Sequence, residues 1–405
     1  MFLAKILCIF LSSVSLIYCQ TKWNTYITLV DNEIYLTASN LALKSLVGLE
    51  KFTNITILDL SINDLIEIEE IKYLTNLKKL NLYSNYIKSL QVLENLTNLT
   101  HLSIGHNYWT SLHGVEKLKK LVYLNILDNK VFTLDVLSNF QYLEMLNQSS
   151  NQNLDRVNGV ENLMELRKLQ MTQNIIRTIE LFVNLTKITH LDLKMNLIET
   201  TKGLENMINL ERLDLSVNKI YMLTNLSGLI SLKYLDLSYN KIEQLNGLKD
   251  LISLIELYLS NNLIKSVDCL IGMKSLQLLT IDTNRIESIK GLEAMTNMSK
   301  LYLNQNKINK LESLENLTKL LYLDSESNQI ESLDYLKKME RLEILKLAFN
   351  KVNNLESLEN LTNLTELSLR SNQIQSTIGL EKMTKLKKVI VLARIQILYH
   401  IGLTY

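Results

Sequence analysis

Apolar residues and asparagines recur along this chain with a period of 22 residues. In one unit, Leu210, Leu213 and Leu215 precede Asn218, and the next unit repeats all four positions 22 residues later. Fifteen such units occupy residues 55–385. Self-similarity at a fixed short period predicts a repeat architecture. The asparagines of the fifteen units are Asn63, Asn85, Asn107, Asn129, Asn151, Asn174, Asn196, Asn218, Asn240, Asn262, Asn284, Asn306, Asn328, Asn350 and Asn372.

The spacing within a unit predicts its local structure. Leu213 and Leu215 are separated by one residue, so both point to the same side of a short strand and Asp214 points to the other. Apolar residues spaced by three follow the asparagine, which is typical of an extended or 3₁₀ return leg. A single coil cannot close a core, but stacked coils pair their strands and bury a continuous leucine column. An asparagine amide donates and accepts, and so suits a buried corner.

We therefore expect an α/β solenoid: a curved array with a concave parallel β-sheet and a convex face of short 3₁₀ or extended segments. One coil breaks the period. The unit that begins at Leu143 has 23 residues, with the extra one near Asn151–Leu154, and Gln148 replaces a strand leucine. This irregularity predicts a local bulge or kink.

The two ends of the array are degenerate. Residues 20–54 are predicted to form an N-terminal capping unit, in which Asn40 comes one residue early. Residues 386–405 begin a further repeat, but Arg394 stands where the asparagine is expected. The apolar tail that follows is interpreted as a cap, as an apolar edge open to self-association, or as the product of a truncated reading frame.

The first 19 residues differ from the rest of the chain. A positive charge at Lys5 precedes the mostly apolar run Ile6–Tyr18, and polar sequence begins at Gln20. This layout predicts a signal peptide, because the run is too short to span a membrane; no membrane insertion is expected after cleavage. An uncleaved anchor or a wrongly assigned first exon is the alternative. Cleavage after Cys19 would leave Cys269 alone, without an intramolecular disulfide.

Charge and motifs argue against several functions. The chain has 43 basic and 42 acidic residues, so no overall basic excess points to nucleic acid. It has no glycine-rich phosphate loop, no Cys/His metal spacing and no G-x-S-x-G, so we expect no enzyme and no cofactor. One unit holds His106 and His113. Their register places them on different sides of the coil, so no metal site is expected, and Trp109 is predicted to be core.

The unit LxxLxLxxNxIxxLxxLxxL resembles the 22-residue class of leucine-rich repeats, over about residues 33–391. That class includes the leucine-rich regulatory subunit of protein phosphatase 1 and the bacterial internalins. The resemblance implies the fold strongly and the function weakly. In the phosphatase regulator, the middle residues of Leu-x-Leu grip the enzyme. The matching residues here are Asp59, Asn81, Ser103, Asn125, Asn147, Gln170, Asp192, Asp214, Asp236, Tyr258, Thr280, Tyr302, Asp324, Lys346 and Ser368.

A partner is expected on the concave face, where the outer side chains of the sheet meet solvent. Asp192, Asp214 and Asp236 fall on three consecutive coils and would focus negative potential on a basic partner. The alternative is that Leu-Asp-Leu is simply a common form of this repeat. Aromatic residues are enriched among interface anchors, and a cation is often found beside them. The further candidates on this face are Tyr239, Tyr258, Tyr302, Phe349 and Arg370.

The chain also contains N-x-Ser/Thr sequons, which accept glycans in secreted proteins. Asn-Leu-Thr is equally a frequent sequence at the repeat junction, so the sequons do not settle the compartment. We predict a secreted or surface recognition or adhesion protein that binds a protein ligand on its concave face. An intracellular regulatory subunit of protein phosphatase 1 or a similar enzyme is the alternative. The sequon asparagines are Asn54, Asn95, Asn98, Asn147, Asn184, Asn225, Asn297, Asn316, Asn360 and Asn363.

Overall fold

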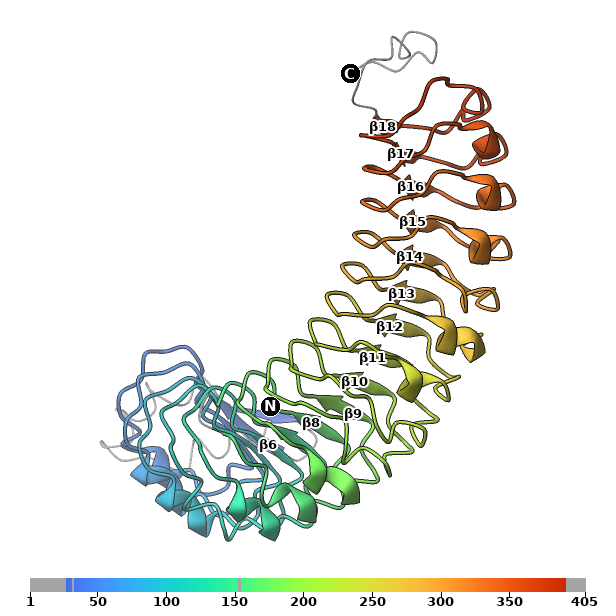
Figure 1. The fold of residues 1–405 in the computed structure, drawn as a ribbon. Coiled ribbons are helices and arrows are strands. Elements are labelled where there is room, and N and C mark those ends of the chain that lie inside the picture. The colour runs from blue at the N-terminus through green and yellow to red at the C-terminus, as the bar shows by residue number, and fades with distance from the viewer. Residues whose placement is uncertain (1–26, 31–32, 152–153, 391–405) are drawn as a thin grey trace. The chain divides into compact units, whose positions relative to one another are not determined.

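A computed structural model describes residues 27–30, 33–151 and 154–390 of the chain (Figure 1). The chain forms two compact units, Met1–Leu197 and Ile198–Tyr405, which are described separately. The predicted signal peptide and the apolar tail with Arg394 lie outside the described residues. Within the described part, no helix is long and apolar enough to cross a membrane.

In the first unit, each coil contributes one short strand, and most coils add a 3₁₀ segment on the return leg. The strands are β1 (Ile27–Val30), β2 (Glu33–Thr37), β3 (Ile57–Asp59), β4 (Lys79–Asn81), β5 (His101–Ser103), β6 (Tyr123–Asn125), β7 (Met145–Asn147), β8 (Lys168–Gln170) and β9 (His190–Asp192). The 3₁₀ segments are η2 (Leu49–Lys51), η3 (Glu69–Tyr73), η4 (Gln91–Asn95), η5 (Asp135–Asn139), η6 (Val160–Asn162) and η7 (Glu180–Asn184).

The second unit repeats the same design. Its strands are β10 (Arg212–Asp214), β11 (Tyr234–Asp236), β12 (Glu256–Tyr258), β13 (Leu278–Thr280), β14 (Lys300–Tyr302), β15 (Tyr322–Asp324), β16 (Ile344–Lys346), β17 (Glu366–Ser368) and β18 (Lys388–Ile390). Its 3₁₀ segments are η8 (Asn246–Leu248), η9 (Asp268–Gly272), η10 (Glu312–Leu314), η11 (Asp334–Leu336) and η12 (Glu356–Leu358).

Within each unit, successive strands pair in parallel and in register. Leu58 of β3 lies opposite Leu80 of β4, and Leu235 of β11 lies opposite Leu257 of β12. These central leucines are buried, while the 3₁₀ segments lie on the side of the coil away from the sheet (Figure 1). The predicted leucine-rich-repeat solenoid is therefore confirmed. The pattern did not predict β1, which pairs with β2 in the antiparallel direction.

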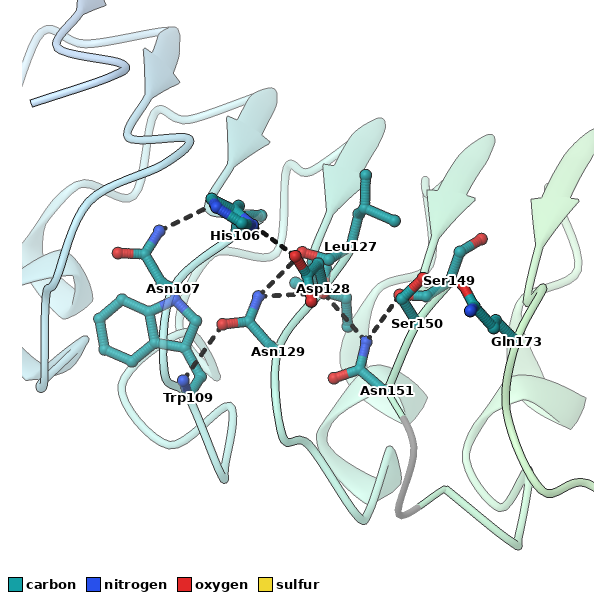
Figure 2. A network of polar contacts seen from close by, with 12 residues as sticks. His106, Asn107, Trp109, Leu127, Asp128, Asn129, Ser149, Ser150, Asn151 and Gln173 are labelled. Atoms are coloured by element: carbon teal, nitrogen blue, oxygen red, sulfur yellow. Dashed lines mark hydrogen bonds and ion pairs between the residues drawn. The ribbon is translucent and has the colours of Figure 1, made fainter.

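The asparagines of the repeat, which we call the ladder asparagines, join each coil to the one before it (Figure 2). The side-chain amide of Asn129 donates to the carbonyls of Ile126 and Leu127 in its own coil, at 3.1 and 3.2 Å. It also donates to the carbonyl of Ile104 in the preceding coil at 3.2 Å, and its oxygen accepts from the Trp109 backbone N–H at 3.1 Å. Each such side chain satisfies backbone groups that the core removes from water.

The residue before each ladder asparagine has a left-handed backbone. These residues form what we call the corner column, and their φ angles lie between 52 and 59°. Asn40 of the predicted capping unit lies one period before Ile62 and adopts the same left-handed conformation, with a φ of 57°. Its early position therefore has a physical reason, because asparagine tolerates the left-handed region well. The column is Ile62, Ser84, His106, Asp128, Ser150, Gln173, Met195, Val217, Tyr239, Asn261, Thr283, Gln305, Ser327, Phe349 and Ser371.

The 23-residue coil keeps the sheet intact. Leu146 of β7 and Leu169 of β8 still lie opposite one another. The extra length is taken up beyond Asn151, where residues 152–153 lie outside the described part, so the predicted bulge is not tested there. Gln148 is 0% exposed, and both polar atoms of its side chain are buried without a hydrogen-bond partner.

Candidate functional site

The first and third residues of each strand point away from the leucine core and form what we call the sheet face. In β10–β12 of the second unit this face carries a cluster of aromatic and charged side chains. The Arg212 guanidinium carbon lies 3.5 Å from the centre of the Tyr234 ring, a cation–π contact. The rings of Tyr234 and Tyr258 have centres 5.2 Å apart, and the Tyr258 hydroxyl donates to Glu256 at 2.8 Å. We call these four residues the tyrosine cluster.

The two hydroxyl groups of this cluster remain protonated well above neutral pH. Burial, followed by the nearby Asp236 carboxylate, raises the pKa of Tyr234 to about 12. Burial and the hydrogen bond to Glu256 also raise the pKa of Tyr258. The cluster therefore offers neutral aromatic surface beside carboxylates, a combination that suits cationic and apolar groups of a partner.

The aspartates predicted to attract a basic partner also hold the backbone. Oδ1 of Asp214 accepts from the backbone N–H and the hydroxyl of Ser216, at 2.9 and 2.6 Å. Asp236 accepts from the Ser238 N–H at 2.9 Å, and Asp192 from the N–H two residues ahead of it at 3.2 Å. Asp214 and Asp236 lie opposite one another on β10 and β11, whereas Asp192 belongs to the first unit. This geometry explains why Leu-Asp-Leu recurs in the repeat.

A second cluster lies on β14–β16. The rings of Tyr302 and Tyr322 have centres 4.6 Å apart, and Lys346 Nζ is 5.4 Å from the Tyr322 ring centre. Lys346 Nζ is also 3.9 Å from Oδ2 of Asp324, a buried carboxyl whose pKa burial raises. Tyr302, a predicted candidate, is therefore engaged by its neighbours. Its ring packs against that of Tyr322 within a polar patch.

Three exposed apolar residues of the second unit lie in the corner column. Val217, Tyr239 and Phe349 are 38, 58 and 48% exposed, with φ angles of 56, 57 and 58°. Arg370, the remaining predicted candidate, lies with its guanidinium carbon 5.5 Å from the centre of the Phe349 ring. Bulky or β-branched residues are disfavoured in the left-handed region, and these gain little burial there. Their exposure makes them candidates for contact with a partner.

The first unit presents a different face. His101 stacks on Tyr123 with ring centres 5.9 Å apart, and burial lowers the pKa of its imidazole. His106 is an exposed corner residue that is hydrogen-bonded to Asp128 (Figure 2). Trp109 is 3% exposed, which confirms its predicted place in the core. Among the described residues, no group of His, Cys, Asp or Glu is arranged to hold a metal ion.

Part of this surface was not predicted from the repeat pattern. Arg212, Tyr234 and Glu256 occupy the first residue of their strands, and only the third residue was considered. The two-residue alternation that points Asp214 to solvent also points Arg212 there, so the signal was present. Tyr239 and Phe349 were placed on the concave face but lie at the corner beyond it.

A family model described as leucine-rich repeats in two copies matches residues 75–117, 208–250 and 252–294. These segments coincide with coils of the structure, so the match and the coil geometry agree on the kind of repeat. The chain is a leucine-rich-repeat protein. Such scaffolds are typical of protein-interaction domains, and no enzyme family is indicated. A comparison with curated proteins finds no match.

Solved structures of bacterial leucine-rich-repeat proteins are similar to this one. The internalin inlF of Listeria monocytogenes is 25% identical, with a TM-score of 0.58 over 89% of this chain and 87% of that chain. The functional domain of InlJ from the same species is 24% identical, with a TM-score of 0.72 over 83% and 73%. A leucine-rich-repeat protein of Leptospira interrogans is 23% identical, with a TM-score of 0.70 over 87% and 94%. The last two likenesses concern the fold alone.

Proposed function

We propose that this leucine-rich-repeat protein is a non-catalytic recognition scaffold that works outside the cell or on its surface. It binds a protein partner on the sheet face and the adjoining corner column of the second unit. The observation that carries the proposal is the exposure of Tyr239 and Phe349 at left-handed corners. Large apolar side chains that face water at a strained position gain burial when a partner covers them.

The chemistry of the surrounding surface supports a partner with basic and apolar groups. Around β10–β13, Asp214, Asp236, Glu256 and Asp282 outnumber the cation of Arg212. Arg212 already lies over Tyr234, so the rings of the tyrosine cluster accommodate a guanidinium group beside carboxylates. A partner arginine or lysine would meet the same environment at Tyr258. Aromatic anchors and charge complementarity together give an interface affinity and orientation.

The extracellular location is supported by the signal-like first 19 residues and by the similarity to the internalin structure at 25% identity. A second candidate, an intracellular phosphatase regulator, is favoured by the 22-residue repeat class. Intact mass and N-terminal sequencing of the protein from its own cells separate the two. A start near Gln20 supports the first, and a start at Met1 in the cytosol overturns it.

Site-specific photocrosslinking tests the binding surface. A photoreactive phenylalanine analogue is placed at Tyr239, at Phe349 or, as the control, at Ile271 on η9, which is equally exposed on the opposite side of the coil. The full chain is incubated with its own cells. We expect one discrete adduct from the first two positions, competed away by unlabelled protein, and none from Ile271. Equal labelling at all three positions would overturn the assignment of the surface.

A further inference from the structure

The sequons of this chain fall into structural classes that the sequence does not distinguish. Four asparagines lie on the outer leg of the coil at or just beyond a 3₁₀ segment, and we call these the outer sequons. Four others immediately precede the first apolar residue of a repeat, and we call these the junction sequons. The outer sequons are Asn95, Asn184, Asn316 and Asn360, and the junction sequons are Asn54, Asn98, Asn297 and Asn363.

Three of the junction sequons, at Asn98, Asn297 and Asn363, have a packing explanation. The Asn98 side-chain amide donates to the Thr75 carbonyl of the preceding coil at 3.1 Å, and its oxygen accepts from Lys120 at 2.8 Å. The hydroxyl of Thr100, which completes this sequon, donates to the Lys78 carbonyl at 3.1 Å. The asparagine and the threonine of this sequon therefore each form a hydrogen bond to the preceding coil.

The same contacts recur at other junctions. The amides of Asn297 and Asn363 donate to the carbonyls of Lys274 and Glu340, at 3.1 and 2.7 Å. Asn76 does the same without a hydroxyl residue two positions on, donating to the Thr53 carbonyl at 2.9 Å. The junction asparagine therefore serves the stacking of coils whether or not a sequon is present.

The outer sequons have no such explanation. Asn95, Asn184, Asn316 and Asn360 are all exposed, and among the described residues their side-chain amides take part in no hydrogen bond. Asn95 and Asn184 are the last residues of η4 and η7, on the side of the coil away from the sheet. A bulky group on these nitrogens would extend into solvent and leave both the core and the sheet face untouched.

We propose that the four outer sequons are N-glycan acceptors and that the folded protein carries its glycans there, leaving the sheet face bare. In the transfer, the side-chain amide nitrogen loses a proton and forms a bond to the anomeric carbon of an oligosaccharide. The bond from that carbon to the pyrophosphate of a lipid-linked donor breaks, and the lipid pyrophosphate leaves. This proposal rests on the proposed entry into the secretory pathway.

A glycan on a junction asparagine would compete with the contacts that join the stacked coils. The nitrogen that would carry the sugar donates to the preceding coil, and the oxygen of the same amide is bonded to the next coil. Neighbouring coils are only about 4.8 Å apart, so a sugar ring that displaced these contacts would crowd the adjoining coil. Asn147 and Asn225 are engaged in other contacts and are not among the proposed acceptors. Asn147 lies on the sheet face with its oxygen bonded to the Ser149 N–H, and the Asn225 amide is bonded to Glu205.

Glycopeptide mass spectrometry in an insect-cell line tests this map. The full chain is expressed behind an added cleavable secretion signal, so that it enters the pathway whatever its natural location. In the secreted pool we expect near-complete occupancy of the outer sequons and almost none at Asn98, Asn297 or Asn363. Glycans at Asn98, Asn297 or Asn363 of the secreted protein, or bare outer sequons, would overturn the proposal.

Matched variants sharpen the result. Thr97→Ala and Thr318→Ala should each remove one glycan, whereas Thr100→Ala should remove none. Met164→Thr creates a sequon at Asn162, the exposed last residue of η6, and should add one glycan. Glycan occupancy is measured in both the secreted and the cell-retained pools, so it can be determined even for a variant that folds poorly. Because entry is forced, this outcome is independent of the native location, which the N-terminal sequencing decides.

Discussion

The two units of this protein use the same coil for different surfaces. The second unit keeps a strict 22-residue period and presents tyrosines and carboxylates, with the Arg212–Tyr234 contact at 3.5 Å. The first unit includes a 23-residue coil with Gln148 buried in it and presents histidines and amides such as Asn125. The frame of leucines and ladder asparagines is common to both. Recognition chemistry can therefore change without any change in the fold, because the sheet face lies outside the core.

The ladder should be the most sensitive part of both units. In the second unit, the Asn240 amide donates to the carbonyls of Leu215, Leu237 and Ser238, at 3.0, 3.0 and 3.3 Å, and its oxygen accepts from the Ile220 N–H at 2.9 Å. Asn240→Ala leaves these buried groups unpaired and should lower the free energy of unfolding by about 3 kcal/mol. Urea unfolding followed by circular dichroism measures this loss.

The irregular coil of the first unit supplies the matched comparison. The Asn151 amide donates to the carbonyls of Ile126 and Ser149, at 3.1 and 3.2 Å, and makes no described bond to the carbonyl of Gln148. Asn151→Ala should therefore cost less, about 2 kcal/mol. Equal losses for the two variants would mean that the 23-residue coil is as tightly closed as a regular one.

Each unit also has a buried neutral side chain whose polar atoms lack a hydrogen-bond partner, and replacing it with an apolar side chain should stabilise the protein. Gln148→Met places an apolar chain where the next coil has Met171, and should raise the free energy of unfolding by about 2 kcal/mol. Ser325→Ala removes one unpaired hydroxyl and should raise the free energy of unfolding by about 1 kcal/mol. Ser371→Ala, at an exposed corner, is the control. A loss of stability with Gln148→Met would show that this residue is needed to close its coil.

Alkaline pH should affect the second unit through Tyr234. Its pKa is raised from 10.0 to about 12 in the folded state, so the unfolded chain ionises first as the pH rises. The contribution of protonated Tyr234 to the free energy of unfolding is fully present below pH 10 and is lost between pH 10 and 12. Tyrosinate absorbance checks this: the difference between the wild type and Tyr234→Phe should appear near pH 12 when folded and near pH 10 in urea.

Acid should affect the first unit through His101, with a smaller effect. Burial, and then the charge of Lys79, lower the pKa of this imidazole below its ordinary value of 6.5. The unfolded chain takes up the proton first, so this stability is present above pH 6.5 and is lost as the pH falls below it. His101→Phe should make the free energy of unfolding depend less on pH below pH 6.5. NMR titration of the imidazole would contradict the prediction if it showed a midpoint above 6.5.

The sequence predicted the frame of the fold well, because the frame depends on periodicity. The 22-residue spacing places Leu213 and Leu235 opposite one another, and Leu-x-Leu fixes which side is buried. The left-handed corners could not be predicted in the same way. Residues such as Ile62 and Val217 disfavour this conformation, and only the closure of the coil imposes it on them.

The candidate surface was predicted in part. Tyr258 and Asp236 followed from the register, but their partners did not, because the Tyr234–Tyr258 contact joins the first residue of one strand to the third residue of the next. That diagonal depends on the twist of the sheet, which no single unit encodes. The antiparallel β1 was missed because it lies outside the repeat pattern.

The ladder asparagines also make the closure of each coil depend on the coil that follows it in the sequence. Asn107 bonds the carbonyl of Leu82 and the N–H of Ile87, so the second coil is completed only by a residue of the third. On the ribosome, where the N-terminal end emerges first, each coil must wait for its successor. The growing chain therefore always ends in one open coil, and synthesis itself sets the order in which the solenoid closes.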